Sequence, residues 1–210
     1  MKGSFVSLQN QSQETRAKVL GLCHISLIRL GDLSRWREEL LEPKSPCFSA
    51  SIEFYELAGR ILPQSGTCHN QLAKVCLKAG DKFGMIYELY RSLATEQPHE
   101  TAKKNLDDGL RDLCRTGQEL KKHAASREQE QSSLEDVLLT FQAYCFFQPT
   151  SARRGLLEED LFQHFLIASD QDGSQDVVSK TLLMSLASEL TARNSMSGEI
   201  VASFHHLARC

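Results

Sequence analysis

The sequence predicts an all-α fold of stacked antiparallel helices, and three observations lead to this prediction. Apolar residues recur at intervals of three and four along nearly all of the 210 residues, which is the spacing of one face of an α-helix. No segment alternates in the manner of a strand, and β-branched residues are sparse. All five prolines lie between the periodic segments, where they mark helix boundaries: Pro43, Pro46, Pro63, Pro98 and Pro149.

The first helix is expected over residues 17–41, after a flexible N-terminus over residues 1–16. Its apolar surface combines Leu20, Leu27 and Leu30 with flanking isoleucines, and it is broader than one neighbour can cover. We therefore expect neighbours on several sides of this helix. Four further helices follow, and together with the first they form a module over residues 17–124. Their expected ranges are 49–62, 68–79, 83–96 and 101–124.

A polar stretch over residues 125–133 reads as a linker, and further helices are expected over residues 134–210. Four apolar stripes carry this expectation. They are centred on Leu138, Leu161, Leu182 and Phe204.

The composition limits the classes of function that the chain can have. The net charge is −3, with 24 Lys and Arg against 27 Asp and Glu, which argues against a chain that coats nucleic acid through its charge. No apolar run reaches the ~20 residues of a membrane span. Seven cysteines are scattered without metal-ligand spacing, which predicts free thiols in the cytoplasm or nucleus. Phosphate-binding and nucleophile motifs are absent. These observations favour a non-enzymatic protein without cofactor, metal, membrane partner or small-molecule substrate.

Two segments read alike, LGDLSRW…SIEFYELAGRILP and LAKVCLKAGDKFGMIYELYRSLATEQP. Ser51, Tyr55 and Ala58 fit the second helix of a tetratricopeptide unit, and Ala73 and Gly80 fit the first helix of the next unit. Small residues are needed where paired helices cross closely. The pattern predicts degenerate tetratricopeptide-like helix pairs, completed by helices on either side.

The order of these motifs resembles the Est/SMG family, which contains the telomerase-associated Est proteins and the nonsense-mediated mRNA decay adaptors. The shared features are the GDLSRW helix, the proline-ended helix, the NQLA helix, the AGD turn, the YRSLA helix and the NL pair, all between Leu30 and Leu106. The resemblance implies a 14-3-3-like and tetratricopeptide module that binds phosphoserine peptides, followed by an Est-type DNA/RNA-binding domain. It also implies that this chain is a fragment lacking the opening helices of that module.

The resemblance assigns three site residues. Arg35, in the motif GDLSRW, would hold the phosphate, since a guanidinium can give two parallel hydrogen bonds to a group carrying about −1.5 to −2 charges. Trp36 would stand where the family motif has a tyrosine, although an indole can donate but not accept a hydrogen bond. Asn70 would hydrogen-bond the peptide backbone. A second basic residue would come from an earlier helix.

Each assignment has an alternative. Arg35 could be an ordinary helix charge paired with Asp32 or Glu39, Asn70 could cap a helix, and Trp36 could serve packing. The expected function is an adaptor that binds a phosphorylated partner, a helicase-type decay factor by resemblance. The alternatives are a telomerase-associated module that contacts RNA or the telomerase ribonucleoprotein, and a tetratricopeptide scaffold without a phosphate role.

Overall fold

The computed structural model describes residues 2–41, 46–123, 133–147, 153–171 and 173–194. Within these ranges the chain forms eight α-helices and no strand, apart from one isolated bridge between Ser65 and Gln97. The all-α prediction is confirmed. The helices are α1 (Lys2–Leu41), α2 (Ser49–Ile61), α3 (Thr67–Ala79), α4 (Lys82–Ala94), α5 (Ala102–His123), α6 (Leu134–Phe147), α7 (Arg153–Ser169) and α8 (Gln175–Asn194).

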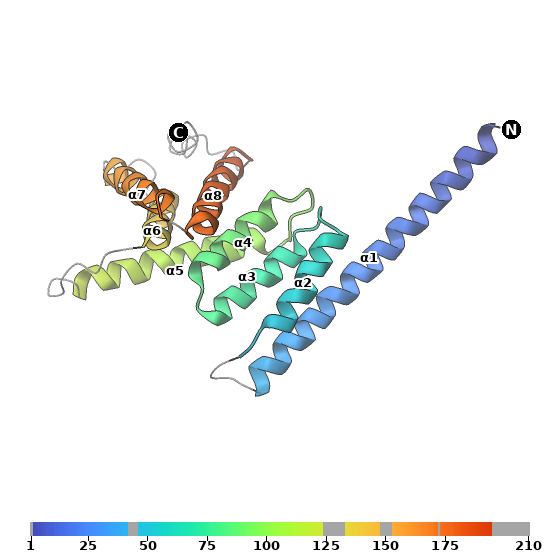
Figure 1. Ribbon diagram of the computed structural model, residues 1–210, viewed down its shortest axis with the longest axis horizontal. Helices are drawn as coiled ribbons and strands as arrows, with labels where there is room; N and C mark the ends of the chain where they lie inside the picture. The colour runs from blue at the N-terminus through green and yellow to red at the C-terminus, as the bar shows by residue number, and fades with distance from the viewer. Residues whose placement is uncertain (1, 42–45, 124–132, 148–152, 172, 195–210) are drawn as a thin grey trace.

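Helices α1 to α4 lie side by side as a row of tilted rods, and α5 continues the row beyond α4 (Figure 1). Small buried residues permit the close crossings, as the repeat pattern predicted. Ser51 and Ala58 of α2 are buried, and Ala73 is buried on α3. A first apolar cluster joins α1, α2 and α3. Its buried members are Ile28, Phe48, Tyr55, Ala58, Cys68 and Val75.

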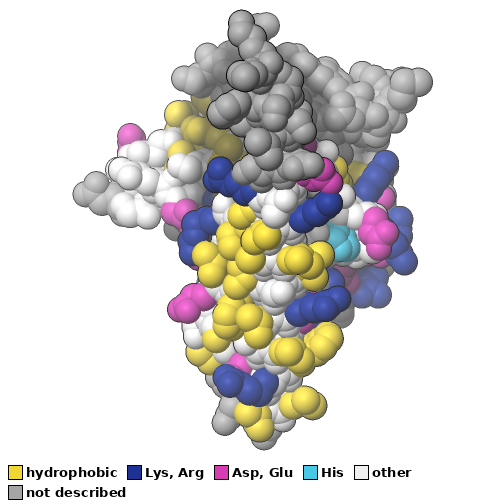
Figure 2. Space-filling view, turned by 90° about the vertical axis from the view of Figure 1, so that its right-hand side faces the viewer, with side chains coloured by type: hydrophobic (Ala, Val, Ile, Leu, Met, Phe, Trp, Pro, Cys, Tyr) yellow, Lys and Arg dark blue, Asp and Glu magenta, His cyan; other side chains and the backbone are white. Residues whose placement is uncertain are grey.

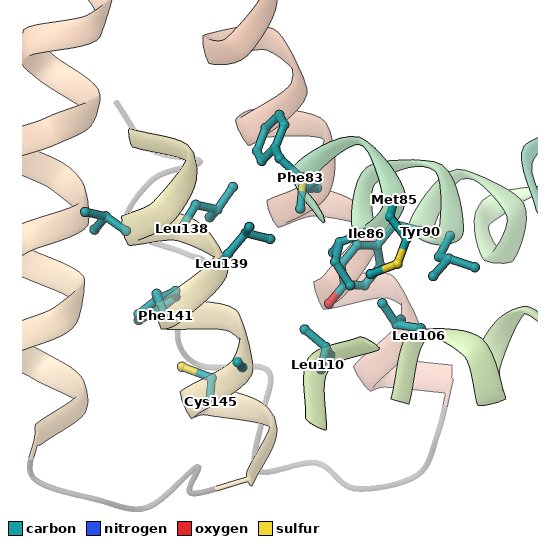
Figure 3. Packing of buried hydrophobic residues seen from close by; sticks show 14 of the residues in the cluster. Phe83, Met85, Ile86, Tyr90, Leu106, Leu110, Leu138, Leu139, Phe141 and Cys145 are labelled. Atoms are coloured by element: carbon teal, nitrogen blue, oxygen red, sulfur yellow. The ribbon is translucent and has the colours of Figure 1, made fainter. Parts of the chain in front are cut away.

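Helices α6, α7 and α8 lie at the far end of the row (Figure 1). Helix α6 packs mainly against α5, α8 packs against α4, and α7 packs on α6. A second and larger cluster runs through this junction (Figure 3). It joins Met85, Ile86 and Tyr90 of α4 to Leu106 and Leu110 of α5 and then to Leu138, Leu139 and Phe141 of α6. One apolar core therefore connects the 17–124 module to the helices that follow it.

Local signals set the ends of several helices. Gly80 ends α3 in a left-handed conformation with φ of 80°. A residue with a side chain adopts this conformation only at a cost in free energy. Asp81 then begins α4, because its carboxylate accepts a hydrogen bond from the backbone N–H of Gly84 at 2.7 Å. Ser133 caps α6 through the backbone N–H of Asp136 at 3.2 Å.

Helix α1 differs from the expectation in two respects. It begins at Lys2, whereas residues 1–16 were expected to be flexible. That stretch contains no proline, so nothing in it forces the helix to stop. The apolar surface of α1 is covered on one side only, by α2 and α3. On its other side, shown in Figure 2, apolar side chains remain exposed: Val19, Leu22, Ile25, Leu30, Leu33, Trp36, Leu40 and Leu41.

Two other expectations fall on residues that the structure does not describe. These are the 125–133 linker, except for Ser133, and the last predicted helix, around Phe204.

Candidate functional site

Arg35 lies on the inner side of α1 and is held by two carboxylates of its own helix. Its Nη1 donates to Glu39 Oε1 at 2.8 Å, and its Nη2 lies 3.5 Å from Asp32 Oδ1. The residue is only 8% exposed. Burial would lower the pKa of the guanidinium, but hydrogen bonds with Tyr55 and Glu39 outweigh it and raise the pKa. Arg35 is thus ion-paired with both acidic neighbours, as the alternative interpretation expected, but it is buried rather than solvated.

Tyr55 of α2 places a second group on Asp32. Its hydroxyl donates to Asp32 Oδ1 at 2.8 Å, which is shorter than the contact between Asp32 and Arg35. The tyrosine ring reaches this position because Gly31 has no side chain, and a Cβ there would overlap the ring. Burial of the hydroxyl, together with its proximity to Asp32, raises the pKa of Tyr55. The phenol therefore remains a donor to Asp32 at physiological pH.

One face of α3 runs past Arg35 and is tied to a neighbouring helix at each end. At one end Asn70, which is fully buried, accepts a hydrogen bond at its Oδ1 from Asn105 Nδ2 of α5 at 2.9 Å. At the other end Lys78 lies 3.6 Å from Glu39 Oε2 of α1. Residues spaced by four share a helix face, so Lys74 lies between these two anchors. The face therefore spans the distance from α5 to α1.

Lys74 is half-buried on this face, within electrostatic reach of Arg35 and Asp32. Burial lowers the pKa of its ammonium, the negative charge of Asp32 raises it, and the positive charge of Arg35 lowers it further. His99, just before α5, has its own pKa lowered by burial and then by the charge of Lys74. Basic side chains therefore follow one another from Arg35 on α1, through Lys74 on α3, to His99 just before α5.

The three residues assigned from sequence lie in different surroundings. Arg35 and Asn70 belong to α1 and α3, which contact each other, and both are buried. Asn70 does not cap a helix, because α3 already begins at Thr67. Trp36 is 50% exposed, and its ring centre lies 5.7 Å from the guanidinium carbon of Arg35, within the range of a cation–π contact.

Lys74 and Asn105 were not singled out as site residues from the sequence. Lys74 has the sequence character of an ordinary polar helix residue, and Asn105 was noted only as part of the NL pair. The packing of α3 against α1 and the hydrogen bond between Asn70 and Asn105 bring them to the site. The available signal for Lys74 was spacing, because Asn70, Lys74 and Lys78 follow one another at intervals of four.

Other kinds of site find no support in the described ranges. There, no three His, Cys, Asp or Glu side chains come together in a way that could hold a metal ion. Within the same ranges, no helix is both long and apolar enough to cross a bilayer. The six cysteines in the described part of the chain are all free thiols, and Cys68 and Cys145 are buried.

Comparisons with known proteins define the class. The profile of the Est1 DNA/RNA binding domain matches residues 51–208, which is more than half of the chain. The chain belongs to this family. The resemblance stated from the motifs is therefore confirmed, although the matched range begins after Arg35 and Trp36.

Two relatives show the breadth of the family. The nonsense-mediated mRNA decay factor SMG7-like of Arabidopsis thaliana is 35% identical over 107 residues, covering 50% of this chain and 12% of the relative. The telomerase-binding protein EST1A of Danio rerio is 35% identical over 80 residues, covering 38% of this chain and 5% of the relative. The matched part of this chain therefore covers about an eighth or less of the length of these proteins.

A chain of the C. elegans SMG5-SMG7 complex superposes with a TM-score of 0.46 at 19% identity, covering 82% of this chain and 44% of the solved one.

Proposed function

We propose that this chain is a non-enzymatic adaptor of the nonsense-mediated mRNA decay type, which binds a phosphorylated protein partner on the face formed by α1 and α3. The observation that carries the proposal is the α3 face itself, anchored to α1 through Lys78 and to α5 through Asn70. The helix α3 carries the buried amide of Asn70, and it contacts α1, the helix that carries the guanidinium of Arg35. Relatives named as mRNA decay factors support the adaptor role.

The geometry indicates which bond of Arg35 a phosphate would replace. The contact of Nη2 with Asp32 is long at 3.5 Å, whereas that of Nη1 with Glu39 is short at 2.8 Å. A phosphate oxygen would take Nη2 and leave Glu39 in place. Asp32 would not be left without a partner, because the Tyr55 hydroxyl already donates to it. The cost of releasing Asp32 is therefore reduced.

Asn70 would bind the peptide backbone. Its Oδ1 is already used by Asn105, whereas its Nδ2 is buried and has no hydrogen-bond partner among the described residues. A buried donor without an acceptor costs about 1–3 kcal/mol. The carbonyl oxygen of a bound peptide would satisfy this donor, once neighbouring side chains give it access.

Binding of a phosphoserine peptide pool to the full chain tests the proposal. The pool has a fixed central phosphoserine and randomised flanks, and the same pool with serine is the comparison. We expect the phosphorylated pool to bind more tightly, and Arg35→Gln to abolish the difference. Arg37→Gln is the matched control, since Arg37 is an exposed arginine on the same helix. Equal binding of the two pools by the unaltered chain would refute the proposal.

The description of the matched family favours a second candidate, binding of DNA or RNA. It makes a different prediction about salt. Nucleic-acid affinity falls steeply with salt because each contacted phosphate releases a counterion. Binding through a single phosphoserine depends on salt much less. Titrating the phosphopeptide pool and a single-stranded RNA at two salt concentrations therefore separates the two functions. Either function would place the chain in the cytoplasm or nucleus.

A further inference from the structure

The charges of the ionic groups paired around Arg35, its own included, cancel. Asp32 and Glu39 contribute two negative charges, and Arg35 and Lys78 contribute two positive ones. These four groups are mutually paired and sum to zero. A neutral cluster offers little attraction to a phosphate, which carries about −1.5 to −2 charges. Arg35 therefore does not by itself make this surface attractive to an anion.

Lys74 adds a positive charge that these four groups do not cancel. It stands one helical turn from Asn70 and one turn from Lys78, whose ammonium lies 3.6 Å from Glu39 Oε2 of α1. No other described residue gives its ammonium a hydrogen bond or an ion pair. It is the only cation at this cluster without a bonded carboxylate among the described residues, and it brings the sum to +1, from three cations and two carboxylates.

We propose that Lys74 is the second cation of the phosphate site, where it would bind the phosphoserine alongside Nη2 of Arg35. This inference rests on the proposed phosphopeptide binding. The resemblance places the second cation on an earlier helix, whereas here α3 would supply it. An ammonium on a four-carbon stem is a compact charge with three donors, so it can follow a phosphate that the rigid guanidinium orients. Burial is the main cause of the lowered pKa of Lys74; Asp32 opposes it, and the positive charge of Arg35 lowers the pKa further.

The test measures the affinity of the phosphoserine pool for three variants of the full chain. Lys74→Met removes the charge and keeps most of the side-chain volume, and Lys74→Arg keeps the charge. Lys82→Met removes an exposed lysine at the start of α4 and serves as the matched control. We expect Lys74→Met to weaken binding about tenfold, Lys74→Arg to stay within about threefold of the unaltered chain, and Lys82→Met to have no effect. Thermal unfolding verifies that each variant is folded, and Lys74→Gln replaces Lys74→Met should the latter aggregate.

The outcomes separate the two proposals. If Lys74→Met retains full affinity while Arg35→Gln loses the preference for phosphoserine, the role of Lys74 is refuted and the proposed function stands. If Lys82→Met weakens binding as much as Lys74→Met, general surface charge accounts for the effect and the role of Lys74 is again refuted. If the unaltered chain does not prefer the phosphorylated pool, the proposed function and this inference both fail.

Discussion

The hydroxyl of Tyr55 donates a hydrogen bond to Asp32 Oδ1 at 2.8 Å, and this bond joins α2 to the acidic partner of Arg35. The same carboxylate oxygen lies 3.5 Å from Arg35 Nη2. The tyrosine therefore shares Asp32 with the arginine and reduces the dependence of Asp32 on Arg35. Although Tyr55 is itself buried, it influences how readily Arg35 can accept another anion.

Tyr55→Phe should lower the free energy of unfolding by about 1–2 kcal/mol, because it removes one hydrogen bond to a charged group and preserves the ring. It should also weaken phosphopeptide binding, since Asp32 would then depend on Arg35 alone. Urea unfolding and the peptide titration measure the two effects. Tyr87→Phe is the control, because the contacts of Tyr87 with Arg91 and Lys180 involve its ring face. Unchanged stability in Tyr55→Phe would contradict the role given to this hydroxyl.

Two glycines of α1 should respond oppositely to alanine. At Gly31 a Cβ would overlap the Tyr55 ring, whereas at Gly21 no atom lies within 4 Å. We expect Gly31→Ala to destabilise the chain by about 1–3 kcal/mol through overpacking. Gly21→Ala should stabilise it by about 0.5–1 kcal/mol, because alanine is the better helix former. Unfolding midpoints measured in parallel test both. A neutral Gly31→Ala would mean that α1 and α2 do not pack this closely.

The sequence was sufficient to predict most helices, and the reason is visible at α2. Ser51, Tyr55 and Ala58 recur at intervals of three and four, and all three are buried as that periodicity requires. Periodicity within one helix is a local property, so it can be recognised without knowledge of the fold. The end of α3 at Gly80 and the start of α4 at Asp81 are also set by local residues, so they too can be recognised in the sequence.

The site could be predicted only in part. Resemblance pointed to Arg35 and Asn70, but their partners depend on contacts between residues far apart in the chain. Asn105 is 35 residues from Asn70, and Lys74 meets the charges of α1 only because α3 packs beside it. The broad apolar surface of α1 led to the expectation of neighbours on several sides, and that expectation was wrong. Periodicity could not show that the covering neighbours lie on one side only.

Stability should depend on pH through His69 and Glu88, which are 2.7 Å apart between His69 Nδ1 and Glu88 Oε2. Burial would lower the histidine pKa, but hydrogen bonds with Cys68 and Glu88 outweigh it and raise the pKa to about 9. Because the folded pKa exceeds the ordinary value of ~6.5, the charged pair stabilises the fold fully below pH 6.5. That contribution is lost as the pH rises through about 9.

The measurement compares the free energy of unfolding at pH 6 and pH 10 for the unaltered chain and for His69→Gln. The difference between the two proteins should shrink by roughly 1–3 kcal/mol at the higher pH. The comparison cancels the titration of other groups. A constant difference across this range would show that His69 is not charged in the folded protein.

The bare side of α1 should cause the chain to self-associate. Leu22 is 66% exposed and Leu33 is 59% exposed, and they belong to the exposed apolar side chains of α1. Exposed apolar patches of this kind promote association. Leu22→Glu combined with Leu33→Lys should therefore shift the chain toward monomer in sedimentation velocity experiments across a concentration series. Leu77→Gln is the matched control, because Leu77 is equally exposed on α3, away from this side. A chain that remains monomeric at high concentration without any substitution would contradict this expectation.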